Sequence, residues 1–276
     1  MTLTKVDSEF IYVYGVCIAE ELQKSEVPDV LGIDHSPIII KVFQDLAALV
    51  TPVSATNYSQ QQIDLLLKDA KWLQGKAFHH HEIIADFQRN FTILPMSFCT
   101  IFQTEGNLES LLTGQYHLLL EKLTYLKGKQ EWNLKLFCDS ELALSYVLKN
   151  NPAITEMKRK LVSMPKGKQF LMRKKLDQLV AAEFELEQAK WRHEILPQLG
   201  SVIDDSNLRQ NWGKEVTERK DEMVGNYDFL IHESKVEQFL NKIAELEKTY
   251  EALGCSFQVT GPWPPYHFAK FVKEKV

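Results

Sequence analysis

Three adjacent histidines, His79, His80 and His81, form the densest group of metal-ligating side chains in the sequence. Successive residues of a helix diverge by about 100° around its axis, so three neighbouring imidazoles cannot converge on one ion. No set of cysteines or carboxylates with the spacing of a metal site accompanies them. We therefore interpret the triplet as the surface start of a helix, and we expect no bound metal.

Covalent or acid-base catalysis would need a nucleophile with its base or a pair of carboxylates. Cys99 has no local catalytic signature around it, so we interpret it as a core residue. Glu183, Glu185 and Glu187 follow one another at two-residue spacing, which spreads them around a helix instead of pairing them. We expect these three carboxylates to be solvated, and we assign no catalytic residue.

Phosphate-binding signals are equally sparse. Gly167-Lys168 lacks both the preceding glycine and the following serine or threonine of a Walker loop, so we expect no nucleotide or other cofactor. A basic group suggests nucleic-acid contact, but acidic residues from Asp177 to Glu187 follow it on the same expected helix. We interpret this basic group as a solvated helix surface; its members are Lys166, Lys168, Arg173, Lys174 and Lys175.

Composition describes an ordinary globular protein of 276 residues, with 45% hydrophobic and 25% charged residues. At roughly 150 residues per domain this length predicts two domains. The net charge of -5 argues against general binding of nucleic acid or of an anionic membrane, and the longest apolar stretches are too short to span a bilayer. Acidic residues flank the first of these stretches, Phe10 to Ala19, where a signal peptide would be basic.

The cysteines give a further indication of the compartment. They are widely separated and form no Cys-x-x-Cys pair. We therefore interpret them as reduced, buried thiols of a cytoplasmic protein. They are Cys17, Cys99, Cys138 and Cys255.

The first half of the chain predicts an α+β unit. Alternation over Phe10 to Ile18 predicts a strand buried on both sides, with Tyr12, Tyr14 and Val16 sharing one face. Three- and four-residue spacing from Gln60 predicts a helix that ends near Gly75, before a second short helix to Arg89. The remaining expected elements are a hairpin of Ile38 to Phe43 with Leu46 to Val53, a strand within Thr92 to Phe102, and a helix containing Leu108 to Leu119.

The polar stretch Lys127 to Gln130 is the expected domain boundary, which gives an N-terminal α+β domain at 1–128 and a second domain at 129–276. The second domain shows the order strand, helix, strand, strand, helix, strand, so its expected fold is a ferredoxin-like sheet with an extended helical crossover. Its expected strands are Glu131 to Cys138, Leu208 to Val216, Gly225 to His232 and Cys255 to Thr260. Its expected helices lie within Ser140 to Leu199 and at Val236 to Leu253.

The helices between Ile154 and Leu199 are the strongest candidate for a partner-binding surface. Met157 and Leu161 lie on one face, and Leu179 and Phe184 lie on another. The alternative is that these apolar residues pack on the chain's own sheet, since a helix paired with a sheet must bury one stripe.

The C-terminal segment Gly261 to Phe268 combines prolines with aromatic residues. Proline lacks an amide donor and fixes φ near -65°, so we expect the segment to leave the last strand as a stiff, extended tail. Its aromatics either cover the chain's own sheet or enter a partner, and we favour the first. The structural residues of this tail are Pro262, Trp263, Pro264, Tyr266 and Phe268.

This tail, Gly261-Pro-Trp-Pro-Pro-Tyr-His-Phe268, also resembles the Gly-Pro-Trp-Pro-Pro-Tyr-x-Phe tail of the gas vesicle protein F and L family. Further matching segments occur in the expected order along nearly the whole chain. They are Tyr12 to Val16, Thr51 to Val53, His81-Glu82, Ile93 to Pro95, Phe98, Thr100 to Phe102, and Glu131-Trp132 with Lys135. The chain departs from the family at Ser97, where Arg is frequent, and at Cys99 and Asn133, where Gly is frequent.

The resemblance implies a cytoplasmic protein that associates with the gas vesicle, binds its small, hydrophobic main shell protein and supports nucleation or assembly of the shell. Other accessory proteins of the vesicle are further implied partners. The alternative from another class is a small-molecule-binding or catalytic module, since ferredoxin-like domains also serve as sensors and enzymes. The missing catalytic and phosphate-binding signals favour the assembly protein over the enzyme.

Overall fold

The computed structural model describes residues 8–270 and divides into two units. The first unit comprises Met1–Glu131 together with Pro262–Val276, and the second comprises Trp132–Gly261. The sequence-based boundary placed all of 129–276 in one domain, whereas the segment from Pro262 onward groups here with the first unit. Independent folding of the two units remains a prediction.

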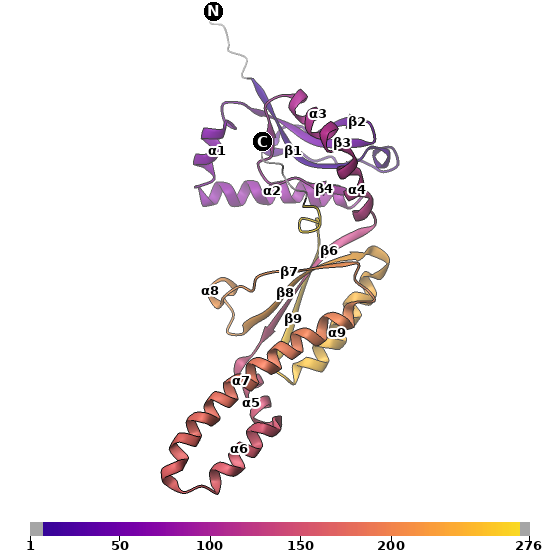
Figure 1. Cartoon of the computed structure of the whole chain (residues 1–276). Coiled ribbons are helices and arrows are strands. Elements are labelled where there is room, and N and C mark those ends of the chain that lie inside the picture. Colours follow the sequence, from indigo (N-terminus) through magenta and orange to yellow (C-terminus); the bar gives the residue numbers. More distant parts are fainter. Residues whose placement is uncertain (1–7, 271–276) are drawn as a thin grey trace, which may run out of the picture. The chain divides into compact units, whose positions relative to one another are not determined.

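The first unit is an antiparallel sheet covered by helices (Figure 1). Its main strand order is β2-β3-β1-β4, with β5 also paired to β1, and the β1 pairings are antiparallel. The strands are β1 (Glu9–Ile18), β2 (Ile39–Phe43), β3 (Leu46–Ser54), β4 (Ile93–Pro95) and β5 (Ile101–Phe102). The helices are α1 (Gln60–Leu66), α2 (Ala70–Gln88), α3 (Glu105–Gly114) and α4 (Tyr116–Leu126), with short 3-10 turns at Ala19–Gln23 and Ile33–His35.

A bulge changes the alternation of β1. The register with β3 shifts between Val13 and Gly15, and Tyr12, Tyr14 and Cys17 belong to one core cluster. The expectation that Val16 shares the face of Tyr12 is therefore wrong, because the extra residue moves Val16 to the other face. Gly15 fits the bulge since a Cβ there would lie 2.8 Å from Ile93 Cγ1.

The hairpin of β2 and β3 is present with the expected two-residue loop, since Phe43 pairs with Leu46. Gln44 takes the left-handed conformation (φ 53°) that glycine usually supplies in such a loop. The boundary between the two helices after β3 differs from the expectation. It was expected near Gly75, but α2 begins at Ala70 and Gly75 lies inside it. Asp69 explains the start, since its side chain accepts hydrogen bonds from the amides of Lys71 and Trp72.

The expected strand within Thr92 to Phe102 is split into β4 and β5. Cys99 stands in the intervening turn with φ 62°, a conformation that glycine adopts with far less strain. Its amide donates to the Tyr12 hydroxyl (3.2 Å), which holds the turn against β1. Cys99 is one of the positions where the resembling family often has glycine, so the structure gives a physical reason for that pattern.

The second unit is a four-stranded sheet with the order β7-β8-β6-β9. Its strands are β6 (Lys129–Cys138), β7 (Asp205–Leu208), β8 (Glu222–His232) and β9 (Cys255–Trp263). Its helices are α5 (Ser140–Asn150), α6 (Pro152–Val162), α7 (Lys166–Leu199), α8 (Lys214–Thr217) and α9 (Val236–Glu251), with a 3-10 turn at Glu233–Lys235. The order of elements is the expected one, and the ferredoxin-like description of this unit stays a prediction.

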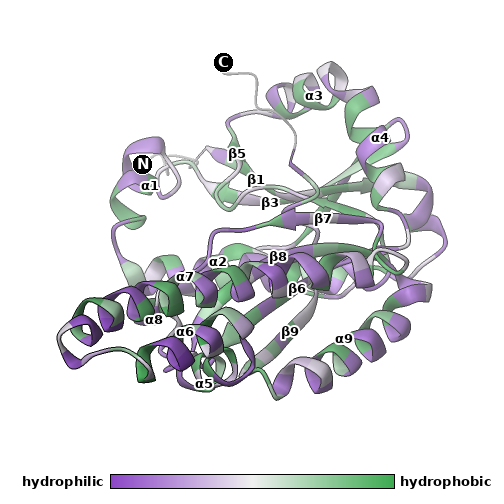
Figure 2. Ribbon diagram, turned by 60° about the horizontal axis from the view of Figure 1, so that its bottom comes forward, coloured by the Kyte–Doolittle hydropathy of each residue, from purple (hydrophilic) through white to green (hydrophobic). Residues whose placement is uncertain are grey.

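The core of the second unit lies between one face of the sheet and helices α7 and α9. Residues of β6 and β8 meet the helices there, and Figure 2 shows hydrophobic and hydrophilic residues interspersed along α7 and α9. The helical members of this core include Trp191, Ile195, Leu199, Phe239 and Ile243. The C-terminal part of α7 is thus the part of this helix that packs in the core.

Two expected strands of the second unit have different bounds. The strand expected at Leu208 to Val216 is wrong beyond Leu208, because the chain leaves the sheet and forms α8. Strand β9 continues through Pro262 to Trp263 instead of ending before the proline. This is possible because β9 is an edge strand, where a missing amide donor leaves no ladder partner unsatisfied.

Candidate functional site

Helix α2 carries the three histidines at its middle, because it begins at Ala70. The expectation of a surface helix start is therefore wrong for this triplet. Each imidazole has a different environment, as the 100° separation requires. His79 lines a surface cavity, His80 is buried with 3% exposure, and His81 contacts the C-terminal tail.

His80 connects α2 to two other segments of the first unit through hydrogen bonds. Its Nε2 lies 3.2 Å from the Met96 carbonyl oxygen and its Nδ1 lies 2.8 Å from the Tyr12 hydroxyl. A carbonyl only accepts, so Nε2 carries the proton and Nδ1 accepts from Tyr12. Burial lowers the pKa of His80 to about 4, so the ring is neutral at physiological pH. A buried, neutral imidazole with both nitrogens hydrogen-bonded indicates a structural role for His80 in the core.

The C-terminal tail packs on the same helix. The Tyr266 hydroxyl and His81 Nδ1 are hydrogen-bonded (3.0 Å), and the rings of His81 and Trp263 lie 5.5 Å apart. Gln88 Nε2 donates to the Trp263 carbonyl (3.2 Å). Tyr266 also packs against the core cluster of the first unit, and its burial raises the pKa of its hydroxyl. These contacts give the tail its place in the first unit.

Buried residues lie on both sides of Tyr266 in the tail. Pro264 and Phe268 are buried, whereas Trp263 is 38% exposed and Pro262 is exposed. His267 donates its backbone amide to Glu131 Oε2 (2.9 Å), and its Nδ1 lies 2.6 Å from Glu131 Oε1. The tail is thus anchored by polar contacts at Glu131 and by apolar burial around it.

Replacing Trp263 by alanine is expected to lower the free energy of unfolding by about 2 kcal/mol, which is less than the loss for a fully buried tryptophan. The reason is its 38% exposure together with its contact to His81. Urea denaturation measures the effect. Phe78→Ala is the matched control, since that aromatic lies on α2 with 61% exposure and should change stability by less than about 0.5 kcal/mol. Equal effects of the two changes would contradict a structural role of Trp263.

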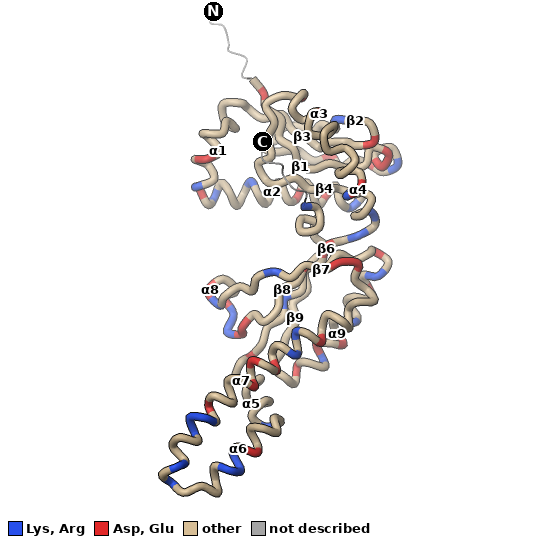
Figure 3. The backbone as a smooth tube through the Cα atoms, viewed as in Figure 1, with Lys and Arg blue, Asp and Glu red and all other residues tan. Residues whose placement is uncertain are grey.

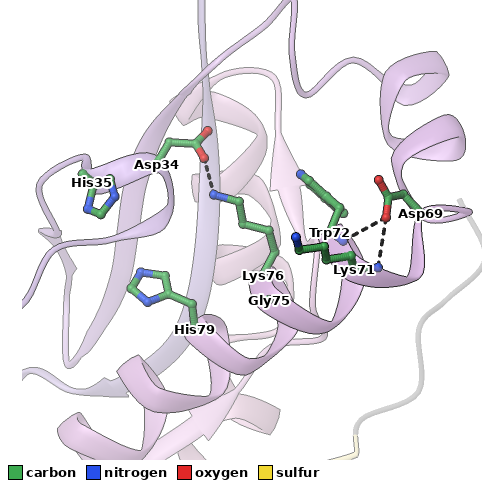
Figure 4. A pocket seen from close by; sticks show the side chains of 8 residues that line it. All are labelled: Asp34, His35, Asp69, Lys71, Trp72, Gly75, Lys76 and His79. Atoms are coloured by element: carbon green, nitrogen blue, oxygen red, sulfur yellow. Dashed lines mark hydrogen bonds and ion pairs between the residues drawn. The ribbon is translucent and has the colours of Figure 1, made fainter.

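A surface cavity of about 500 Å³ opens beside the N-terminal half of α2 (Figure 4). Asp34 and His35 enter it from a turn in which both residues have positive φ. Asp34 forms an ion pair with Lys76 (2.5 Å) and accepts from the Tyr58 hydroxyl (2.8 Å). The remaining lining residues come from the cap of α2 and from its first half up to His79; they are Asp69, Lys71, Trp72, Gly75 and His79.

The lining of this cavity mainly holds the local structure. Asp34 bridges its turn to α2, and Asp69 caps the helix. Both carboxylates therefore have structural partners, which disfavours them as a general base. Cys99 is similarly disfavoured as a nucleophile, because burial raises the pKa of its thiol to about 11.

The expected partner-binding residues all lie on α6 and α7 and are half-buried. Met157 and Leu161 lie on α6, and Leu179 and Phe184 lie on α7. Phe184 packs against the core of the second unit, so for this residue the structure favours the alternative of self-packing. The structure brings these residues together on one helical hairpin, and it leaves more exposed apolar residues nearby.

The carboxylates Glu183, Glu185 and Glu187 point to different environments on α7. Glu183 accepts a hydrogen bond from Asn151 Nδ2 (2.7 Å), so it links α7 to the cap of α6. Glu185 is exposed as expected, and Glu187 lies 3.8 Å from Lys190. The expectation of solvation is wrong for Glu183, because the hairpin brings Asn151 against it.

The exposed apolar residues of the hairpin escaped the sequence analysis. Val162, Phe170 and Leu171 are 82%, 77% and 65% exposed, and they lie on either side of the turn that joins α6 to α7. In the sequence they look like ordinary members of an apolar stripe. The signal that could have identified them is the density of lysine and arginine around them, which is typical of an exposed surface.

Solved structures define the class of this fold. The crystal structure of gas vesicle protein GvpF from Anabaena sp. PCC7120 has a TM-score of 0.71 at 15% identity, and covers 96% of this chain and 100% of that chain. GvpF from Microcystis aeruginosa has a TM-score of 0.63 at 18% identity, with 95% and 99% covered. The chain has the mixed α+β fold of these gas vesicle proteins.

Sequence comparison extends the likeness from fold to family. Gas vesicle protein F of Streptomyces sp. (strain CB03234) is 25% identical over 259 residues, which cover 94% of this chain and 99% of that protein. Gas vesicle protein L1 of Halobacterium salinarum is 22% identical over 261 residues, with 93% and 89% covered. The family model of the gas vesicle synthesis protein GvpL/GvpF matches residues 10–270, and the chain belongs to this family.

Within residues 8–270, no helix has the length and apolar character needed to cross a membrane.

Proposed function

We propose that this chain is an accessory or minor structural protein of the gas vesicle, which binds the main shell protein and supports nucleation or assembly of the vesicle. It acts in the cytoplasm, through protein contacts and without catalysis, and so contributes to buoyancy. The observation that carries the proposal is the match of the GvpL/GvpF family model to residues 10–270. Other gas vesicle accessory proteins are further proposed partners.

The hairpin of α6 and α7 is the proposed partner-binding element. It carries the half-buried Met157, Leu161 and Leu179 together with strongly exposed apolar residues near its turn. Exposed apolar side chains at one site are typical of protein interfaces. The tail supports the fold in this proposal, because Tyr266 and Phe268 are engaged within the first unit.

A small-molecule-binding or catalytic module is the competing proposal, and the cavity beside α2 is the observation in its favour. Its lining carboxylates already hold a turn and a helix terminus, and Lys76 is paired with Asp34. The cavity offers no acid and base that are poised against each other. The assembly protein is therefore the function that the site supports best.

Co-expression with the main shell protein of the same gas vesicle gene cluster tests the proposal. We expect the tagged chain to retain the shell protein through purification, and we expect cells that lack the chain to form fewer or no vesicles. An unrelated acidic protein with the same tag is the control for adhesion of the hydrophobic shell protein. Normal vesicle formation without the chain, together with no retention of the shell protein, would refute the assembly function.

A further inference from the structure

The turn of the α6–α7 hairpin and the adjoining helix ends, residues 157–176, form a strongly basic surface that we name the hairpin tip. It contains eight lysines and arginines and no aspartate or glutamate, whereas the whole chain carries a net charge of -5. Figure 3 shows these basic residues on α6 and the adjacent part of α7. All eight are exposed; they are Lys158, Arg159, Lys160, Lys166, Lys168, Arg173, Lys174 and Lys175.

Few carboxylates neutralise this charge. Glu156, at the edge of the tip, pairs with Arg159 (2.9 Å) and Lys160 (3.5 Å). Among residues 8–270, no carboxylate lies within ion-pair distance of the five basic residues that α7 contributes to the tip; the ion pair on α7 joins Lys190 to Glu187, beyond the tip. Like charges at this density repel one another, so an isolated tip carries an unfavourable electrostatic energy that an anionic partner would relieve.

Apolar side chains are interleaved with these charges. Phe170 precedes Lys174 by four residues, and Leu171 precedes Lys175 by four, so each apolar residue shares a helix face with a basic one. Val162 joins them from the end of α6 with 82% exposure. Charge and apolar surface therefore alternate along the same faces instead of lying on opposite sides.

The fold holds this surface away from the core of its own unit. Phe184 is the first residue of α7 that packs against that core, so 18 residues precede it in the helix. At 1.5 Å per residue these residues span about 27 Å. Contacts between α6 and α7 and the bond from Asn151 to Glu183 keep the two helices together as a unit.

We propose that the hairpin tip is the docking surface for an acidic, amphipathic helical segment of another gas vesicle protein. This inference rests on the proposed function for the nature of the partner. An amphipathic helix with acidic residues beside apolar ones matches the interleaved pattern of the tip. Its carboxylates pair with the basic residues of α7, and its apolar face covers Phe170, Leu171 and Val162.

An anionic lipid surface fits this geometry less well. Lys166 and Lys168 lie nearer to the turn than Phe170 and Leu171, so the apolar residues could enter a bilayer only after these two charges. A nucleic acid would use the positive charge but would leave Val162 and Leu171 uncovered. A protein partner uses both properties of the tip.

Binding of a synthetic peptide to the full-length chain tests the proposal. The probe is a fluorescent 21-residue helix with leucine on one face and glutamate on the other, and its matched control has glutamine in place of glutamate. We expect the glutamate peptide to bind, with an affinity that falls as salt rises, and the glutamine peptide to bind about tenfold more weakly. Equal binding of the two peptides would overturn the charge complementarity.

Matched variants locate the binding surface. Lys174→Glu with Lys175→Glu, and separately Phe170→Ser with Leu171→Ser, are each expected to weaken binding about tenfold. All four residues are exposed, so the fold should persist, which circular dichroism checks. The controls are Lys220→Glu with Lys248→Glu, and Leu142→Ser with Leu186→Ser, which change equally exposed residues of the same unit.

The outcomes separate this inference from the proposed function. Loss of peptide binding in the tip variants but not in the controls supports docking at the tip. Binding of the wild type to phosphatidylglycerol-containing vesicles or to a DNA duplex, without binding to the peptide, would overturn it. If the chain retains the shell protein but the tip variants bind the peptide as well as the wild type does, docking at the tip is refuted and the assembly function is not. Peptide binding by the tip, together with normal vesicle formation without the chain and no retention of the shell protein, would refute the assembly function alone.

Discussion

Replacement of Trp191 by alanine is expected to lower the free energy of unfolding of the second unit by about 3 to 5 kcal/mol. Trp191 is 3% exposed in the core between α7 and the sheet, and its ring lies 6.4 Å from that of Tyr146 on α5. Truncation would leave a cavity where α7, α5 and the sheet meet. Hydrogen exchange of the β6 and β8 amides, measured by mass spectrometry at increasing urea concentration, checks this. The variant should lose protection of these amides at a lower urea concentration than the wild type.

Leu186→Ala is the matched control for this experiment, because Leu186 lies on the same helix with 62% exposure. Its effect should stay within about 0.5 kcal/mol. Since Trp191 anchors the helix that carries the hairpin tip, Trp191→Ala should also weaken partner binding at temperatures where the second unit begins to open. A stable Trp191→Ala variant would show that α7 is not held by this contact.

Acidification from pH 6.5 to pH 4 is expected to destabilise the first unit through His80. Burial lowers the pKa of His80 from 6.5 to about 4. Above pH 6.5 the imidazole is neutral in both the folded and the unfolded chain, so the stabilisation is fully present. Between pH 6.5 and pH 4 the unfolded chain binds a proton that the folded chain does not bind, which lowers the free energy of unfolding. The total loss is about 3 kcal/mol, and below pH 4 this residue adds no further loss.

His80→Gln isolates this contribution, because glutamine keeps one donor for Met96 and one acceptor for Tyr12 while losing the titration. The difference in stability between the wild type and this variant should shrink as the pH falls through that window. Hydrogen exchange of the β1 amides in urea measures it, and the exposed His117→Gln serves as the control. A constant difference across pH 4 to 6.5 would contradict the buried, neutral His80.

Local features of this fold can be predicted from the sequence, whereas features that depend on distant segments cannot. Strand β1, the hairpin of β2 and β3, and helix α9 follow from alternation and helical spacing, which are local properties of the chain. The bulge at Gly15 and the end of β7 at Leu208 depend on the neighbouring strand, so a single segment does not reveal them. The break at Asp69 was readable in principle, because an N-cap is a local signal.

The candidate site shows the same division. Apolar spacing identified the helices that carry Met157, Leu161, Leu179 and Phe184, but burial separates Phe184, which packs on the core, from the exposed Phe170. That distinction depends on which turns of α7 reach the sheet. The sequence likewise revealed the five basic residues at the start of α7, but only the structure places them beside the basic end of α6, since that proximity depends on how the two helices pack.

The sequence by itself determined the mixed α+β class, the family resemblance carried by the tail from Gly261 to Phe268, and the divergence of the three histidines, because these depend on local motifs and on helix geometry. Only the tertiary structure decided that His80 enters the core, that the tail packs on α2 beside His81, and that the hairpin tip stands clear of its own core. The physical reason is that burial and contact are properties of residues far apart in the chain. Tyr266 and His81 are 185 positions apart, and no local pattern records that they meet.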